Sequence, residues 1–96
     1  MEAVIAHLVR YVAVLAQSAR ETTRAEDRHV YTAHLATAAE LFLAAYEADA
    51  AKLRDLTSRE RRAYGWGYLS GAQGHAAEKA FVEFAHFIEG ADADAA

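Results

Sequence analysis

Apolar residues recur along this chain at every third or fourth position, which is the period of an α-helix that buries one face. The first such segment runs from Glu2 to about Arg20, and polar residues including Arg10 fall on the side opposite the apolar ones. We therefore expect a first amphipathic helix over these residues. Its predicted buried line consists of Val4, Ile5, Leu8, Val9, Val12, Leu15, Ala16 and Ala19.

A second helical pattern covers residues 24–55, and Thr23 followed three residues later by Glu26 matches a capping box at its start. Asp49 falls on the centre of the buried line, where a carboxylate needs a partner or water. Either Asp49 pairs with an arginine or lysine, or the helix ends or bends near Ala48 and Asp49 caps the next helical segment. The predicted buried line consists of Tyr31, Leu35, Ala38, Phe42, Ala45, Leu53 and Leu56.

The third pattern covers residues 57–90 and contains all five glycines of the chain. Thr57 followed by Glu60 matches a second capping box, and the apolar line keeps one phase across the glycines, which favours a single long helix. An aromatic loop around Trp66 is the alternative, because glycines alternate with aromatic residues there. The predicted line consists of Ala63, Gly67, Ser70, Gly74, Ala77, Phe81, Ala85 and Ile88.

These patterns predict an all-α protein of three helices, in which a short N-terminal amphipathic helix precedes a long antiparallel helical hairpin. We expect a single helical domain over residues 1–90 and a disordered acidic tail over residues 91–96. Alanine makes up 25 of the hydrophobic residues and adds little apolar area, so the core of one chain is small. Small cores often gain stability from a second subunit, and we therefore expect a homodimer.

Composition excludes several kinds of site. The chain has no cysteine, so it forms no disulfide and has no thiolate metal ligand or cysteine nucleophile. The net charge of −4 arises entirely in residues 63–96, and this acidity disfavours nucleic acid as a partner. Arg10 interrupts the first apolar run, so we expect neither a signal peptide nor a membrane span, and a cytoplasmic location.

Two Glu-x-x-His pairs have the spacing that supplies a carboxylate and an imidazole to one metal in ferritin-like di-iron bundles. They are Glu26 with His29, and Glu83 with His86. Both pairs fall opposite the apolar lines, whereas di-iron ligands point inward, and pairs of this kind are frequent by chance. A metal-binding or oxidoreductase protein is therefore an alternative function, whereas no cofactor is expected.

Arg24 and His29 fit an Arg-x4-His spacing that is similar to the catalytic motif of small helical ribonucleases of the HEPN class. The resemblance is confined to this motif, and Ala25 stands where those enzymes usually place a polar residue. It implies a second alternative function, a small HEPN-like ribonuclease. Solvated charges at the start of a helix explain the same residues without any chemistry.

The first functional hypothesis is a small protein–protein interaction module that acts as an adaptor, regulator or inhibitor without catalysis. It rests on the amphipathic helices, the small residues near the glycines and the aromatic side chains beside them. His34 lies at the edge of an apolar face, where a core histidine is expected rather than a ligand or base. The predicted partner or dimer interface consists of Trp66, Gly67, Ser70, Gly74, Phe81 and Phe84.

Overall fold

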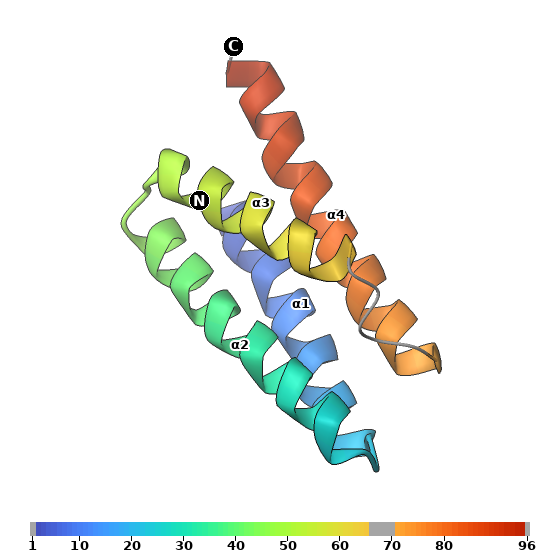
Figure 1. Ribbon diagram of the computed structural model, residues 1–96. Helices are drawn as coiled ribbons and strands as arrows, with labels where there is room; N and C mark the ends of the chain where they lie inside the picture. The colour runs from blue at the N-terminus through green and yellow to red at the C-terminus, as the bar shows by residue number, and fades with distance from the viewer. Residues whose placement is uncertain (1, 66–70, 96) are drawn as a thin grey trace.

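A computed structural model describes residues 2–65 and 71–95 of the chain, with side chains described at residues 2–63 and 74–90. In these ranges the chain forms four α-helices and no strand (Figure 1). The prediction of an all-α protein is confirmed, and the predicted count of three helices is too low. No helix of the described part combines the length and apolarity that a membrane crossing requires. The helices are α1 (Glu2–Glu21), α2 (Ala25–Tyr46), α3 (Ala50–Gly65) and α4 (Gly71–Ala95).

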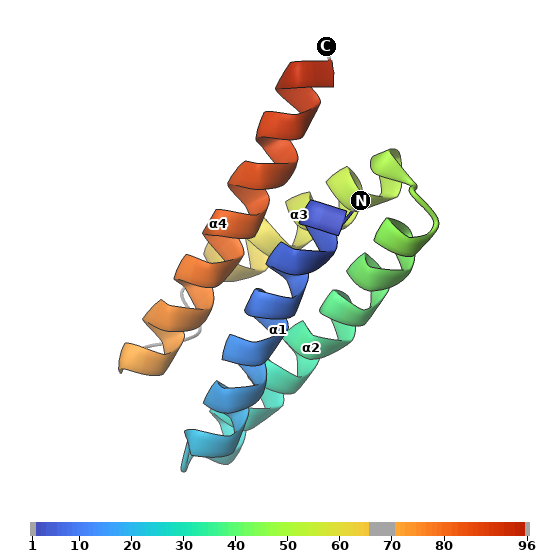
Figure 2. The same ribbon diagram turned by 180° about the vertical axis from the view of Figure 1, so that it is seen from behind.

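The helices close into a ring around one core, because each packs on its neighbours in sequence and α4 packs on α1. Helices α1 and α2 lie side by side and antiparallel, and α1 lies between α2 and α4 (Figure 2). Helix α3 crosses behind α1 in this view and packs against both α2 and α4. The largest fully buried side chains are Tyr11, Tyr31, Phe81, Phe84, Leu8, Leu15 and Leu41.

Polar contacts hold the connection between α1 and α2. Arg28 donates from Nη2 to the Thr22 carbonyl at 2.9 Å and from Nε to the Ala19 carbonyl at 3.3 Å, and these contacts satisfy acceptors at the end of α1. The N-cap of α2 is Arg24, which makes no side-chain capping hydrogen bond. The capping box predicted from Thr23 therefore does not start this helix.

Ser18 and Tyr31 tie α1 to α2 through a buried side-chain hydrogen bond. Burial raises the pKa of Tyr31 above its ordinary value, and the nearby Asp27 carboxylate raises it further. The hydrogen bond with Ser18 acts in the opposite direction. The folded chain thus favours the neutral phenol at this position.

The second predicted helix is broken at residues 47–49, so the alternative in which the helix ends near Ala48 is confirmed. Ala48 has a φ of 55°, and two backbone hydrogen bonds close the end of α2: Ala48 N to Ala45 O at 3.1 Å, and Asp49 N to Ala44 O at 2.9 Å. This pair of bonds around a left-handed residue is the Schellman arrangement. Asp49 then caps α3, since its Oδ1 accepts a 3.1 Å hydrogen bond from Lys52 N.

The single long helix predicted over residues 57–90 is wrong, because α3 ends at Gly65 and α4 begins at Gly71. Arg61 forms an ion pair with Glu89 across the two helices. In one continuous helix these residues would lie about 42 Å apart, since each residue adds about 1.5 Å. Each of the two helices buries one face against the same core, and their apolar lines agree in phase although the helix is not continuous.

Thr57 and Glu60 do not form the predicted capping box either, because both lie inside α3 and are buried. The Thr57 hydroxyl donates a 2.7 Å hydrogen bond to Leu53 O on the preceding turn. At the other end of the chain, the backbone of residues 91–95 belongs to α4. A disordered tail there stays a prediction.

The buried face of α1 is turned slightly from the predicted one. Tyr11 and Ser18 are buried, whereas Val9, which we placed on the buried line, is 54% exposed. Both buried polar residues have partners, because Tyr11 contacts Glu60 and Ser18 contacts Tyr31. A pattern of apolar residues alone does not predict which polar side chains are buried through hydrogen bonds with one another.

Candidate functional site

A buried carboxylate, Glu60, lies where α1, α2 and α3 meet. Leu53, Leu56, Thr57 and Glu60 repeat at helical spacing and form the buried stripe of α3, which brings Glu60 into the interior with 4% of its surface exposed. Burying a carboxylate costs much free energy unless hydrogen bonds compensate it. Glu60 therefore needs donors from the neighbouring helices.

Two side chains supply those donors. The Tyr11 hydroxyl donates to Glu60 Oε2 at 3.0 Å, and His34 Nδ1 lies 2.9 Å from Glu60 Oε1. When Glu60 is ionised it only accepts, so the Nδ1 of His34 carries the proton that it shares with Oε1. Among the described residues no buried side-chain nitrogen or oxygen lacks a hydrogen-bond partner. His34 is thus the core histidine that the sequence led us to expect.

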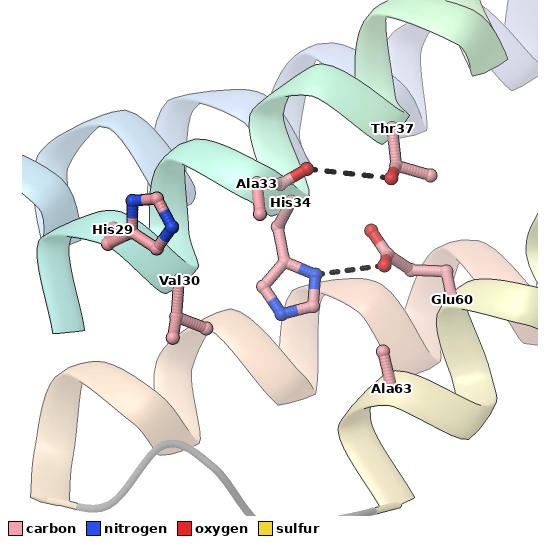
Figure 3. A pocket seen from close by; sticks show the side chains of 7 residues that line it. All are labelled: His29, Val30, Ala33, His34, Thr37, Glu60 and Ala63. Carbon is pink, nitrogen blue, oxygen red and sulfur yellow. Dashed lines mark hydrogen bonds and ion pairs between the residues drawn. The ribbon is translucent and has the colours of Figure 1, made fainter. Parts of the chain in front are cut away.

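The Glu60–His34 pair forms part of the wall of a pocket of about 270 Å³ between α2 and α3 (Figure 3). This volume is just below the range of about 300–1,000 Å³ that is usual for ligand sites. His29 and Val30 lie further toward the start of α2, and Ala63 lies below Glu60. The described lining residues are His29, Val30, Ala33, His34, Thr37, Glu60 and Ala63.

A histidine oriented by a carboxylate resembles the base and orienting group of a nucleophilic triad, which also needs a nucleophile within hydrogen-bond reach of the histidine. The hydroxyl among the described lining residues belongs to Thr37, and it donates to Ala33 O on its own helix at 3.5 Å. In Figure 3 the Thr37 hydroxyl bonds to the backbone, whereas His34 bonds to Glu60. Through Glu60 the cluster links α1, α2 and α3.

The exposed surface holds a second feature, an apolar face shared by α1 and α2. The large hydrophobic side chains that are most exposed in the described chain all lie there: Val9 at 54%, Leu43 at 59% and Tyr46 at 85%. Partly buried Ile5, Val12, Leu35 and Phe42 continue it toward the core. We call it the α1–α2 outer face and define it by Ile5, Val9, Val12, Ala13, Ala16, Leu35, Ala36, Ala39, Phe42, Leu43 and Tyr46.

Charged side chains flank the α1–α2 outer face but do not enter it. On the far side of α1, Arg10 lies 3.7 Å from Glu83 of α4. On the far side of α2, Glu40 lies 3.6 Å from Arg59 of α3. These charges pair with the neighbouring helices, and none of the residues that define the face is charged. A face of this composition has the character of a protein-contact surface.

Three of the six residues predicted as a partner or dimer interface, Gly74, Phe81 and Phe84, have a different environment. Phe81 is 1% exposed and Phe84 is fully buried, and Phe81 packs against the ring of Tyr11 at a centroid distance of 5.7 Å. Gly74 is also buried. These residues pack inside the chain, which leaves little area on them for a partner. Trp66, Gly67 and Ser70 lie outside the described residues.

The residues of the metal hypothesis are not brought together within one chain. Glu26 and His29 are exposed near the start of α2, and Glu83 and His86 are exposed on α4. Across the described side chains, no group of three or more His, Asp or Glu residues is arranged to hold a metal ion.

The residues of the ribonuclease motif also have other neighbours. Arg24 donates a 3.0 Å hydrogen bond to Glu26 and lies 3.9 Å from Asp27. The hydrogen bond with Glu26, followed by the charges of both carboxylates, raises the pKa of Arg24 above its ordinary value. His29 lines the pocket beside α3. The arginine is therefore engaged by carboxylates at the start of its own helix.

Sequence reasoning missed two residues of the buried cluster, Tyr11 and Glu60. The signal for Glu60 was present, because it lies seven, four and three positions after Leu53, Leu56 and Thr57. Its match to a capping box concealed that signal. Comparison of the chain with protein-family models, with curated proteins and with solved structures gave no match in any of the three.

Proposed function

We propose that this protein is a small helical protein–protein interaction module that binds its partner through the α1–α2 outer face and performs no catalysis. One observation carries the proposal: the most exposed large apolar side chains of the described chain gather on two neighbouring antiparallel helices, with no charge among them. Exposed apolar surface of this kind costs solubility, and in monomeric proteins large patches commonly mark contact sites.

The interior supports the same proposal. The buried histidine and carboxylate pair with each other and with Tyr11, and the Thr37 hydroxyl beside them bonds to the backbone. These groups stabilise the packing of α1, α2 and α3. They therefore hold α1 and α2, which carry the outer face, in a fixed arrangement. A rigid surface loses less conformational entropy on binding than a mobile one.

Site-specific photo-crosslinking tests the proposal. A photoreactive amino acid is placed at Val9 or at Leu43, and a matched control carries it at Lys79, an exposed position of α4 away from this face. We expect discrete protein adducts, identified by mass spectrometry in the native host, from positions 9 and 43 and few from position 79. Equal adduct patterns at all three positions would exclude the α1–α2 outer face as the contact surface.

A further inference from the structure

From the charges at the two ends of the α1–α2 outer face, we infer that its partner is a second copy of this chain, bound antiparallel so that α1 lies across α1 of the partner subunit. The inference rests on the proposed function, since it names the occupant of the same surface. It is based on the position of charge along α1, on the symmetry of isologous contacts and on the size of the face.

Glu2 and Arg20 stand at opposite ends of one line on α1. They are separated by 18 positions, which is five helical turns and about 27 Å. Val9 lies near the same line, about 20° from it, so the two charges mark the ends of the outer face. The same polarity is repeated along α2. Its C-cap residue Glu47 lies at the end near Glu2, and Arg28 lies at the end near Arg20, where its guanidinium bonds to neutral carbonyls of Ala19 and Thr22 and keeps its charge. The face is therefore acidic at one end and basic at the other.

The remaining carboxylates at the basic end have partners on their own chain. Glu21 accepts a 2.7 Å hydrogen bond from Gln17, and Glu26 and Asp27 lie close to Arg24. Arg20 is exposed at the last turn of α1. Arg24 offsets part of the charge of Glu26 and Asp27. The amide of Gln17 is neutral and leaves the charge of Glu21 in place, but Glu21 lies about 100° around α1 from Arg20 and so points away from the outer face.

A homodimer that uses one face on both copies has a twofold axis in the plane of contact. If the axis runs along the helices, like ends meet, and Glu2 and Glu47 of both copies come together. If the axis runs across the helices, opposite ends meet, and Glu2 of each copy approaches Arg20 of the other. Like charges placed together oppose binding, so the charge pattern selects the second arrangement. It sets the two α1 helices antiparallel, with α2 against α2.

The area of the face is large enough for a dimer contact with a second copy of the chain. A 20-residue helix is about 30 Å long, and two neighbouring helices are about 20 Å wide, so the contact covers about 600 Å² on each copy. The total of about 1,200 Å² stands at the lower end of the range for specific protein complexes. A face of this size is sufficient for a specific dimer, whereas its affinity depends on the contacts and not on the area.

Disulfide trapping tests the arrangement, and the chain has no cysteine of its own to interfere. Two single variants are made, Glu2→Cys and Arg20→Cys, and each is oxidised alone and in an equal mixture with the other. In the antiparallel dimer only the mixture brings the two cysteines together, and it keeps one Glu2–Arg20 pair at the opposite end. We expect covalent dimers in the mixture and at least about tenfold less in either variant alone, because a disulfide needs Cα atoms within about 7 Å.

Light scattering of the unmodified chain and of Leu43→Glu provides the second measurement. Leu43 is 59% exposed, so a charge there leaves the core intact, which circular dichroism verifies. We expect the wild type to dimerise and Leu43→Glu to raise the dimer dissociation constant at least about tenfold, whereas Lys79→Glu on α4 leaves it unchanged. A monomeric wild type, or trapping of Glu2→Cys with itself, would overturn the inference.

The two proposals fail in different ways. A monomeric chain that still gives specific adducts from Val9 with another protein would retain the interaction module and refute the second copy as its partner. A dimer whose dissociation constant does not respond to Leu43→Glu, and whose position 9 gives no adducts, would refute both.

Discussion

The hydroxyl of Tyr11 donates a 3.0 Å hydrogen bond to Glu60 Oε2 across 49 positions of sequence. Together with His34 on the other carboxylate oxygen, this bond links α1, α2 and α3 through one side chain. Both donors are buried together with Glu60. Replacing it has consequences for all three helices.

Glu60→Ala is expected to lower the free energy of unfolding by about 3–5 kcal/mol, because it leaves the Tyr11 hydroxyl and His34 Nδ1 without their acceptor and opens a cavity. Urea titration followed by circular dichroism measures the loss. Glu78→Ala, at an exposed position of α4, serves as control and is expected to change stability by less than about 0.5 kcal/mol. Equal losses in the two variants would contradict a structural role for the buried cluster.

Truncation of Phe81 tests the packing of α4 on α1. Its ring is buried and tilted by 56° against the ring of Tyr11. We expect Phe81→Ala to cost about 3–5 kcal/mol. Glu83→Ala on the exposed side of the same helix removes only a 3.7 Å pair with Arg10, which contributes about 0–1 kcal/mol. Thermal melts that ranked the variants in the reverse order would contradict the buried face of α4.

Ala48→Gly is expected to stabilise the protein by about 0.5–1 kcal/mol. Ala48 has a φ of 55°, a conformation that costs a residue with a Cβ about 1–2 kcal/mol, and glycine avoids this cost at the expense of a more flexible unfolded chain. The melting temperature should rise by a few degrees. Ala76→Gly, inside α4, should lower it by a similar amount because glycine weakens a helix interior. A lower melting temperature for Ala48→Gly would show that residue 48 is not left-handed in solution.

Stability is expected to fall at alkaline pH in a manner that depends on Tyr31. Because burial raises the pKa of Tyr31 in the folded chain, the folded state holds the phenol proton more tightly than the unfolded state does. The associated stabilisation is present below the ordinary tyrosine pKa of about 10 and is lost as the pH rises through the folded value. Melting temperatures between pH 8 and about pH 11 should therefore decline less steeply in Tyr31→Phe than in the wild type. Tyr46→Phe, at an exposed position, serves as the control. If it flattened the decline of melting temperature with pH as much as Tyr31→Phe does, the decline would have another cause than Tyr31.

The helical period predicted the fold class and much of the core, because a helix that buries one face must repeat apolar residues every three or four positions. It located Leu8, Phe81 and Ile88 in the interior, where they lie. It did not separate α3 from α4, since two helices that bury faces against one core can share a phase by chance. The pattern reports which side of a helix is buried and not the element that covers it.

Helical periodicity could not predict the buried cluster or the outer face either, for a related reason. Glu60 becomes suitable for the interior only when Tyr11 and His34 arrive from distant parts of the sequence. Val9 was placed on the buried line because it is apolar, whereas its exposure results from how α1 is rotated between α2 and α4. Both outcomes depend on tertiary contacts, which local spacing does not contain.

The place of α1 between α2 and α4 also affects how the protein is made. A ribosome releases the chain from its N-terminus, so α1 and α2 emerge while α4 is still to be synthesised. About 40 residues separate the end of α2 from Ile88, which corresponds to about 2–8 s of synthesis at roughly 5–20 residues per second. During that interval the pair of α1 and α2 lacks the helix whose Phe81 packs against Tyr11. Binding by a chaperone, or by a chain already complete, would protect it until α4 arrives.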